Sequence, residues 1–466
     1  MAIKQVQVEV DNLTVGMYIS RLDRPWSQTP FPLQGFHVRS KEDIITLRAY
    51  CDYVYVDTEK GRTPVDVSGS VSSVSQGGIR RRRGLTGSPA GRRKGDRDSG
   101  FSTSPLVVRK GVYAATVALS QEMARAETVV KHLKGHLTVV SKQIAKGKLV
   151  DYDKLRHSVD DMVSSVLRCP DAFTWLIRLR AKDSHTHDHS LRSALWAVQF
   201  ARFIGMEKQE ISVLCMGTML KDVGKIKIPN ALLRKLDRSE EEQLEYQRFV
   251  DYGVEMLRNS RAVEPRVISV VRYHCERLNG TGFPERLAGN KIPLLARMAG
   301  IATVFDAVSN PAETEEPVSP SKAVSSLYNL RGIEFQEDLV VQFIQSIGLY
   351  PTGTLVELTS GDIGVVVEQH SDSRLTPQVA VLDRLGGDLN KNFFLIDLKD
   401  QEATRKAMLE QGRKDVEAVD RISIARDLEP SGYEFDLDTI STVFMNAEVD
   451  EKRTGLLSSL RDRFRH

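Results

Sequence analysis

The chain has 466 residues, 41% of them hydrophobic and 27% charged, which is typical of a soluble globular protein of two or three domains. Its formal net charge of +3 is too small to indicate a general nucleic-acid binder, so any attraction for anions has to be local. No apolar run approaches the roughly 20 residues that span a bilayer, and the first residues lack the apolar stretch of a secretory signal. The four cysteines lack CxxC spacing, so neither a disulfide scaffold nor a zinc knuckle is expected, and we expect the protein in the reducing cytoplasm.

Residues 1–60 are predicted to form a small β-rich module with one helix. Val6, Val8 and Val10 alternate with polar residues, as in a half-buried strand. Further strands are predicted at 36–39 and 54–56, with a turn at 13–17 and a short helix that begins near a capping box at residue 40.

Residues 61–104 are rich in Ser, Gly and Arg and are predicted to form a disordered linker, because they offer almost nothing to bury. Two basic clusters, Arg80–Arg83 and Arg92–Lys94, could contact an anionic surface or a polynucleotide. We favour a solvated tether over that alternative.

Residues 105–348 follow a helical pattern. The proline-free segment 110–147 is either a signalling helix between modules or the first helix of a bundle, and we favour the bundle. Further helices are predicted near 152–168, 171–181, 187–204, 208–221, 239–258, 262–277, 292–309 and 335–347. A capping box at Ser239 and Glu242 opens one of them.

The pattern changes to short apolar stretches between Gly and Asp turns at 349–400, which predicts a small antiparallel sheet. Residues 401–466 are charged and are predicted to be partly helical. The expected fold is therefore multidomain α+β: a β-rich N-terminal module, an all-helical domain and a small antiparallel β C-terminal subdomain.

Polar residues recur inside the helical region in a set order. His185 and His189 are four residues apart and share a helical face, as metal-binding histidines do. Asp222, Lys225 and His274 follow. Such a set could hold divalent metals that activate water against a phosphodiester. Spacing alone does not separate this from polar residues scattered at helix ends.

Residues 150–350 resemble the HD-GYP branch of the HD phosphohydrolase superfamily, whose bacterial members hydrolyse cyclic di-GMP. The segments that carry the resemblance are 183–192, 222–229, 274–284, 287–293 and 304–307. Residues 1–60 also resemble the uncharacterised module that commonly precedes HD-GYP domains. The resemblance implies an all-helical catalytic domain with two or three iron, manganese or similar ions.

The sequence departs from the family at several expected site positions. The His-Asp pair of the family is Lys221-Asp222 here, and the tyrosine of Gly-Tyr-Pro is Phe283, between Gly282 and Pro284. Three other expected metal ligands are replaced by Phe249, Cys275 and Thr303, so that only Asp306 remains of the last aspartate pair. The basic residues that hold the dinucleotide phosphates correspond to Ala312 and Glu315.

The resemblance leaves His189, Asp222 and His274 as possible metal ligands, with His185 and Cys275 weaker, and Asp222 and Lys225 as residual catalytic residues. An ammonium group at position 221 places positive charge where an imidazole would bind an ion, so we expect the binuclear site to be lost. We therefore expect no cofactor, and Fe, Mn or Zn only if the site is retained.

Three functions remain open at this point. The first is a degenerate HD-GYP protein that acts in cyclic di-GMP signalling by binding other signalling proteins, without hydrolysis. The second is a cyclic di-GMP phosphodiesterase with a reduced metal site. The third is a sensor that binds cyclic di-GMP without cleaving it, against which Ala312 and Glu315 argue.

Overall fold

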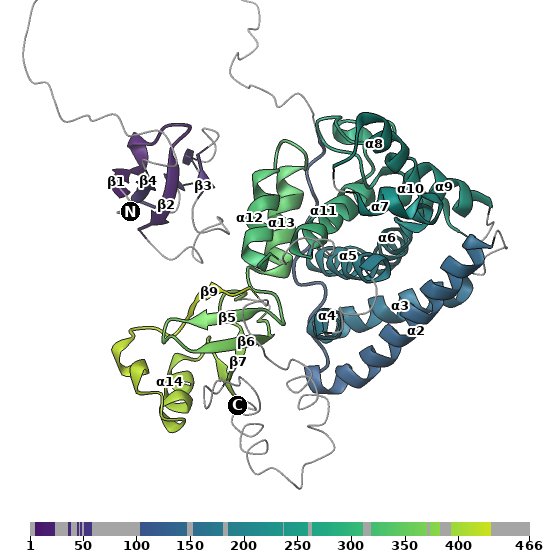
Figure 1. Cartoon of the computed structure of the whole chain (residues 1–466). Helices are drawn as coiled ribbons and strands as arrows, with labels where there is room; N and C mark the ends of the chain where they lie inside the picture. Colours follow the sequence, from purple (N-terminus) through teal and green to yellow (C-terminus); the bar gives the residue numbers. More distant parts are fainter. Residues whose placement is uncertain are drawn as a thin grey trace, which may run out of the picture. The chain divides into compact units, whose positions relative to one another are not determined.

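The computed structural model describes residues 5–23, 36–38, 44–45, 47–48, 51–57, 103–146, 152–179, 185–235, 237–259, 263–310, 318–370, 373–382 and 393–429. The chain divides into two compact units, residues 1–100 and 101–466 (Figure 1). The predicted linker lies outside the described residues, except for 103 and 104.

The first unit contains a four-stranded antiparallel sheet. Its strands are β1 (Gln5–Glu9), β2 (Tyr18–Leu22), β3 (Phe36–His37) and β4 (Tyr53–Asp57), in the order β1-β4-β2-β3. The alternation predicted from the valines is confirmed for Val8 and Val10, which are buried on either side of the exposed Glu9, whereas Val6 is 43% exposed. Strand β2 was not predicted: the turn at 13–17 leads directly into it. Residues 44–45 and 47–48 are helical, in agreement with the short predicted helix.

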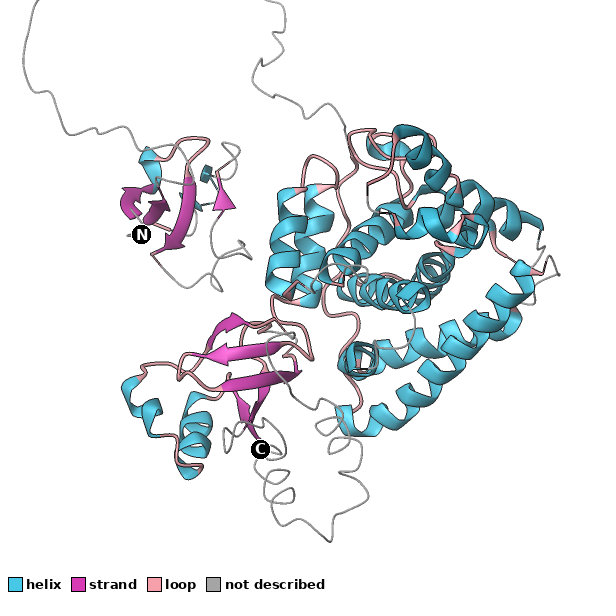
Figure 2. Cartoon of the chain, in the orientation of Figure 1, coloured by secondary structure: helices cyan, strands magenta, loops and turns pink. Residues whose placement is uncertain are grey.

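The second unit begins with a helical region (Figure 2). Its helices are α2 (Leu119–Ala145), α3 (Asp153–Arg168), α4 (Pro170–Leu179), α5 (His185–Phe203), α6 (Lys208–Leu220), α7 (Asn230–Arg234), α8 (Glu240–Gln247), α9 (Phe249–Asn259), α10 (Pro265–Tyr273), α11 (Leu294–Ser309), α12 (Pro320–Asn329) and α13 (Glu337–Ile347). Helix α5 packs against both α6 and α11, which brings segments more than 100 residues apart to one place.

Several helix boundaries differ from those predicted. Helix α2 begins at residue 119 rather than 110, since Gly111 has a positive φ of 80° and the chain from 103 to 118 is not helical. The predicted helix 239–258 is two helices, α8 and α9, that meet at Arg248, although its capping box is present as expected. Helices α7 and α12 were not predicted.

The second unit ends in a five-stranded antiparallel sheet with the order β8-β7-β6-β5-β9. The strands are β5 (Leu355–Leu358), β6 (Ile363–Glu368), β7 (Gln378–Leu382), β8 (Phe393–Asp397) and β9 (Ile424–Asp427). Strand β9 belongs to the segment predicted as a charged tail, as does α14 (Gln401–Glu410), whose Met408 packs in the core of the sheet. Among the described helices, none is both long enough and apolar enough to cross a membrane.

Candidate polar site at the ends of α6 and α10

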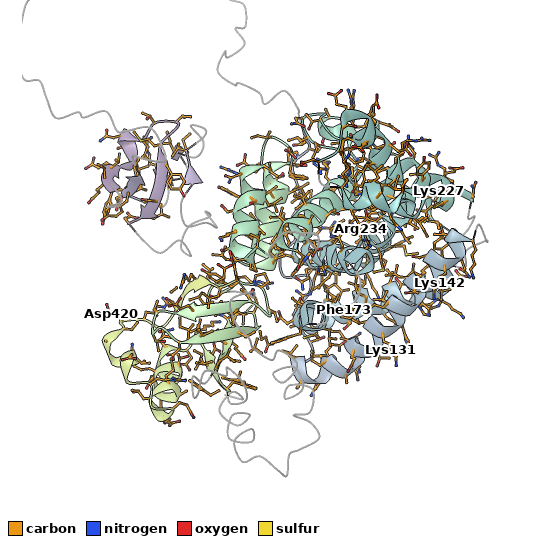
Figure 3. The ribbon with its side chains drawn as sticks, in the orientation of Figure 1. Lys131, Lys142, Phe173, Lys227, Arg234 and Asp420 are labelled. Atoms are coloured by element: carbon orange, nitrogen blue, oxygen red, sulfur yellow. The ribbon has the colours of Figure 1, made fainter. Side chains whose placement is uncertain are left out.

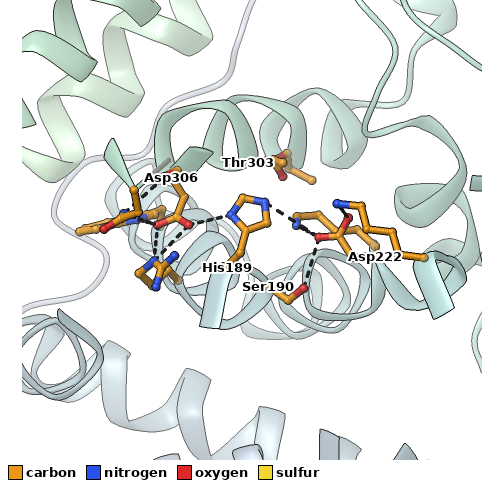
Figure 4. Close-up of polar contacts among 11 residues, drawn as sticks. His189, Ser190, Asp222, Thr303 and Asp306 are labelled. Atoms are coloured by element: carbon orange, nitrogen blue, oxygen red, sulfur yellow. Dashed lines mark hydrogen bonds and ion pairs between the residues drawn. The ribbon is translucent and has the colours of Figure 1, made fainter. Parts of the chain in front are cut away.

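The polar residues singled out in the sequence meet where α6 and α10 end, beside the first half of α5 and the last turns of α11 (Figure 4). Helix α6 ends at Leu220, and residues 223–227 continue as the 3-10 helix η3. Helix α10 ends at Tyr273, so that His274 is its C-cap. The two polar words of the sequence, Lys221-Asp222 and His274-Cys275, therefore lie at helix ends rather than within helices.

Gly224 fixes how η3 lies against α9. A Cβ atom at this position would stand 1.9 Å from the carbonyl oxygen of Phe249 and 2.4 Å from the backbone nitrogen of Gly253. Real Cβ atoms do not approach backbone this closely, so only glycine permits the contact. The close approach holds Lys225 near the Phe249 ring, with its ammonium 5.1 Å from the ring centroid.

Asp222 is the centre of the first half of the site. Its carboxylate is 5% exposed and forms ion pairs with two ammonium groups, those of Lys221 and of Lys225, the latter at 2.7 Å. The sequence left open whether Lys221 and Asp222 touch, and the structure pairs them. The hydroxyl of Ser190 donates a long hydrogen bond of 3.4 Å to the same carboxylate.

Charge compensation at Asp222 changes the pKa values around it. Burial would raise the pKa of Asp222, but the charges of Lys221 and Lys225 hold it well below its usual value. Burial lowers the pKa of Lys221, which is fully buried, while Asp222 opposes that shift. The pKa of Lys225 is raised because Asp222 outweighs its burial. The result is a carboxylate held ionised by two protein cations.

Asp306 is the centre of the second half of the site and is fully buried. It accepts hydrogen bonds from His189 Nδ1 at 2.8 Å and from Arg192 Nε at 2.8 Å. Trp196 Nε1 and Asn310 Nδ2 also donate to it, at 3.3 and 3.1 Å. Burial would raise the pKa of Asp306, but His189 and Arg192 keep it lowered. Every oxygen of this carboxylate thus has a donor of the chain itself.

His189 lies between the two halves. Its Nδ1 faces Asp306, and its Nε2 stands 3.9 Å from Asp222 Oδ2, beyond hydrogen-bond distance. Burial and the charge of Lys221 lower its pKa, against the opposing effect of Asp306. The neutral ring donates from Nδ1 to Asp306, which leaves the lone pair of Nε2 directed at the Asp222 side.

His274 is 2% exposed and lies behind Asp222. Its Nδ1 donates to the carbonyl oxygen of Val271 at 2.8 Å, and its Nε2 is 3.2 Å from Cys275 Sγ. Burial lowers the pKa of His274 to about 3, with Lys221 and Lys225 adding to that shift. Burial also raises the pKa of Cys275 to about 12. Cys275 is therefore a thiol that donates to His274, not a thiolate ligand.

The Phe283 ring closes this side of the site. Phe249 contacts both His274 and Phe283, with ring centroids 6.0 and 6.1 Å apart. Glu276 holds the loop around Phe283 by accepting backbone hydrogen bonds from Glu285 and Leu287 at 2.8 and 2.9 Å. Gly282 is required there, since a Cβ atom would stand 2.4 Å from the Cα of Glu276.

The structure brings together most of the site residues predicted from the sequence. Some residues that hold these side chains in place were not predicted. Thr303 donates its hydroxyl to the Ala299 carbonyl of its own helix, at 2.7 Å. Arg192, Trp196 and Asn310 were missed; Arg192 and Trp196 lie three and seven residues after His189, a helical spacing that would have placed them on its face. The side chains of His185, His187 and Asp188, and residues 312 and 315, lie outside the described part.

The donors present do not fit a pair of divalent ions. Both oxygens of Asp222 hold ammonium groups, Nε2 of His274 faces a thiol, and Asp306 is bound by an arginine. Within the described residues, no three His, Cys, Asp or Glu side chains are grouped so that they could hold a metal ion. A binuclear site needs several carboxylate or imidazole donors that are not already bound to cations.

Comparison with known proteins agrees with the motifs. Residues 5–155 match a domain of unknown function, DUF3391, and residues 176–337 match the HD domain family. The cyclic di-GMP phosphodiesterase PA4108 of Pseudomonas aeruginosa is 28% identical over 379 residues, which cover 80% of this chain and 84% of that protein. A 3'3'-cGAMP-specific phosphodiesterase 2 of Vibrio cholerae is 31% identical over 164 residues, 35% of this chain and 31% of that protein.

Solved structures include Bd1817, an HDG"Y"P protein from Bdellovibrio bacteriovorus, which covers 73% of this chain and 98% of its own with 13% identity and a TM-score of 0.42. The sequence matches carry the assignment. Residues 5–155 are thus similar to the DUF3391 module and residues 176–337 to the HD domain, and the relatives that the chain matches include phosphodiesterases of cyclic di-GMP and of 3'3'-cGAMP.

Proposed function

We propose that this chain is a non-hydrolysing member of the HD-GYP branch that acts in cyclic di-GMP signalling by binding other signalling proteins. The observation that carries the proposal is the ammonium group of Lys221, which is fully buried and paired with Asp222. It stands where the family has the histidine of its His-Asp pair. A protein cation at that position competes with a metal ion for the same carboxylate.

Electrostatics supports this proposal. Two divalent ions and the ammonium of Lys221 cannot share one buried carboxylate without strong repulsion, because like charges at short range interact strongly away from water. Lys225 also occupies the second oxygen of Asp222. Since the charge of Asp222 is already offset within the chain, the pocket needs no ion to be stable.

The test is metal content and turnover of the full chain, purified without a metal-affinity tag. The protein is incubated with Mn²⁺ or, without oxygen, with Fe²⁺, passed through a desalting column, and measured by elemental analysis and by release of linear dinucleotide from cyclic di-GMP. The Pseudomonas aeruginosa relative, treated in parallel, is the positive control. We expect substoichiometric metal and no cleavage; stoichiometric metal together with cleavage contradicts the proposal.

A second candidate is a cyclic di-GMP phosphodiesterase with a reduced metal site, and the similarity to a phosphodiesterase over 80% of the chain favours it. In this candidate His189, Asp222 and His274 hold a single ion, which would activate water, and Lys225 contacts a phosphate of the substrate. It requires that Lys221 lose its proton or move. If cleavage is found, Asp222→Ala must abolish it, whereas an exposed variant on α2, Lys131→Ala, must not.

A further inference from the structure

A second cavity, of about 630 Å³, lies at the opposite ends of the helices that carry the polar site. It is lined by residues 152–160, 208–216 and 263–267, at the N-terminal parts of α3, α6 and α10. The polar site follows the last residues of α6 and α10, and Met216, which lines the cavity, precedes Lys221 by five residues, a rise of about 8 Å along the helix. The volume falls in the range of sites for small organic ligands.

The inner wall of the cavity is apolar. Val159 of α3, Val213 and Met216 of α6, and Val267 of α10 line it and are each no more than 8% exposed. A surface of this kind favours a ligand with an apolar or aromatic body, because burying that body against it removes apolar area from water on both sides.

The hydroxyl of Tyr152 lies on the same wall. It lines the cavity and is 1% exposed, and its hydroxyl has no hydrogen-bond partner among the described residues. A buried hydroxyl without a partner is destabilising, because it has lost its hydrogen bonds to water. Buried polar groups are rarely left so, and a ligand with an acceptor at this point would satisfy it.

Three helix N-termini surround the cavity, and none has a side-chain cap. The N-cap residues Tyr152, Glu207 and Glu264 make no capping hydrogen bond, so the first backbone N–H groups of α3, α6 and α10 lack that partner. Helix N-termini carry partial positive charge and favour anions.

The charged side chains on the cavity rim are of both signs. Arg156 and Lys208 line it, and so do Asp160 and Glu264. Asp160 accepts a hydrogen bond from Ser212 at 2.7 Å, and Glu264 lies 3.9 Å from a guanidinium nitrogen of the neighbouring Arg266. These two acids offset the two cations of the rim, so the preference for a negative group rests on the three helix N-termini.

We propose that this cavity binds a small organic anion with a flat apolar body, such as an aromatic acid. The body lies on the four apolar side chains, the anionic group lies at the helix N-termini beside Lys208, and Tyr152 donates a hydrogen bond to the ligand. The proposal does not depend on whether the HD site hydrolyses a substrate, since it concerns a separate cavity.

The test uses two fluorescent probes of nearly the same shape with the full chain. 8-Anilino-1-naphthalenesulfonate carries the anionic group, and N-phenyl-1-naphthylamine lacks it. We expect saturable binding of one sulfonate probe per folded chain, on the order of tenfold tighter than the neutral probe. Binding that does not saturate, or equal affinity for both probes, overturns the proposal.

Variants assign the binding to this cavity. Val213→Phe places a ring against the apolar wall and is expected to weaken both probes, whereas Tyr152→Phe is expected to weaken only the sulfonate probe, about fivefold, because the neutral probe offers the hydroxyl no acceptor. Lys208→Glu, an exposed change that tests the site even if Val213→Phe fails to fold, is expected to weaken only the sulfonate probe, by about fivefold. The matched control is Lys131→Glu, exposed on α2 (Figure 3). Equal effects of Lys208→Glu and Lys131→Glu contradict the assignment.

Discussion

The two halves of the polar site, centred on Asp222 and on Asp306, each stabilise a buried carboxylate, but with different partners. Asp222 and Asp306 are both buried, and both carboxylates are held ionised by partners from the chain itself. Asp222 has two lysines, one of them fully buried. Asp306 has an arginine, a histidine, a tryptophan and an asparagine, each donating at 3.3 Å or less.

The two halves differ in whether their cationic partners can lose a proton. An arginine keeps its charge under all ordinary conditions, whereas a buried lysine can lose its proton. The Asp306 half is therefore fixed, because removing Asp306 leaves the permanent charge of Arg192 and the donors of Trp196 and Asn310 without their acceptor. The Asp222 half has an adjustable charge, because its buried lysine can lose a proton.

The largest expected effect comes from deleting each carboxylate in turn. Asp306→Ala leaves Arg192 buried without its partner and should lower the free energy of unfolding by about 3–5 kcal/mol. Asp222→Ala should cost about half as much at pH 7, since Lys221 can lose its proton. Urea unfolding at pH 7 and pH 9 measures both. The cost of Asp222→Ala should shrink at the higher pH and that of Asp306→Ala should not; equal costs at both pH values would remove the distinction between the halves.

The next effect concerns the metal. Lys221→His removes the buried ammonium and adds an imidazole beside Asp222, so affinity for Zn²⁺ or Mn²⁺ should rise on the order of tenfold or more over the natural chain. Titration calorimetry after treatment with a chelator measures it. Lys221→Met, which removes the charge but adds no donor, is the matched control. If the histidine and methionine variants bind metal equally, the added ligand has no role.

The next prediction concerns how the free energy of unfolding depends on pH through His274, which lies near Asp222. His274 has a folded-state pKa of about 3, below the ordinary value of 6.5. Between these values the unfolded chain binds a proton that the folded chain does not, so the free energy of unfolding falls as pH falls, by at most about 1.4 kcal/mol per pH unit for this group. His274→Gln should make the curve shallower between pH 6 and pH 4. His157→Gln, an exposed control on α3, should leave the slope unchanged.

The smallest expected effect is at Ser190. Its hydrogen bond to Asp222 is 3.4 Å long and adds to two ion pairs on the same carboxylate. Ser190→Ala should lower the free energy of unfolding by about 0.5–1 kcal/mol. Thr303→Ala is a fair comparison, since that hydroxyl bonds only within its own helix. A loss at Ser190 above that at Asp222 would contradict the ranking.

Local features of the fold were predictable from the sequence. The capping box at Ser239 is present, and the alternation is present at Val8 and Val10 but not at Val6; each involves residues close in sequence. His189, Asp222 and His274, which the family resemblance named together, do lie close to one another, and their role as metal ligands stays a prediction.

Features that depend on packing between distant segments were not predictable. Asp306 was expected to be what remains of a metal-binding pair, and its arginine partner lies 114 residues away on α5. Strand β9 was read as part of a charged tail, since only its pairing with β5 makes it a strand. In each case the contact that fixes the structure joins residues that are far apart in the sequence.

Two hydrogen bonds join α4 of the helical region to the C-terminal sheet and the residues just before it. The indole nitrogen of Trp175, on α4, donates to the carbonyl oxygen of Val367, on β6, at 2.7 Å, and Asp171 of α4 accepts from Thr352 just before the sheet. Helix α4 in turn packs against α5, which carries His189 and Arg192. A protein that binds the sheet could therefore shift α4 and, through it, the helix that carries His189 and Arg192. A chain that ends before β5 would expose the Trp175 indole, which is buried in the intact fold.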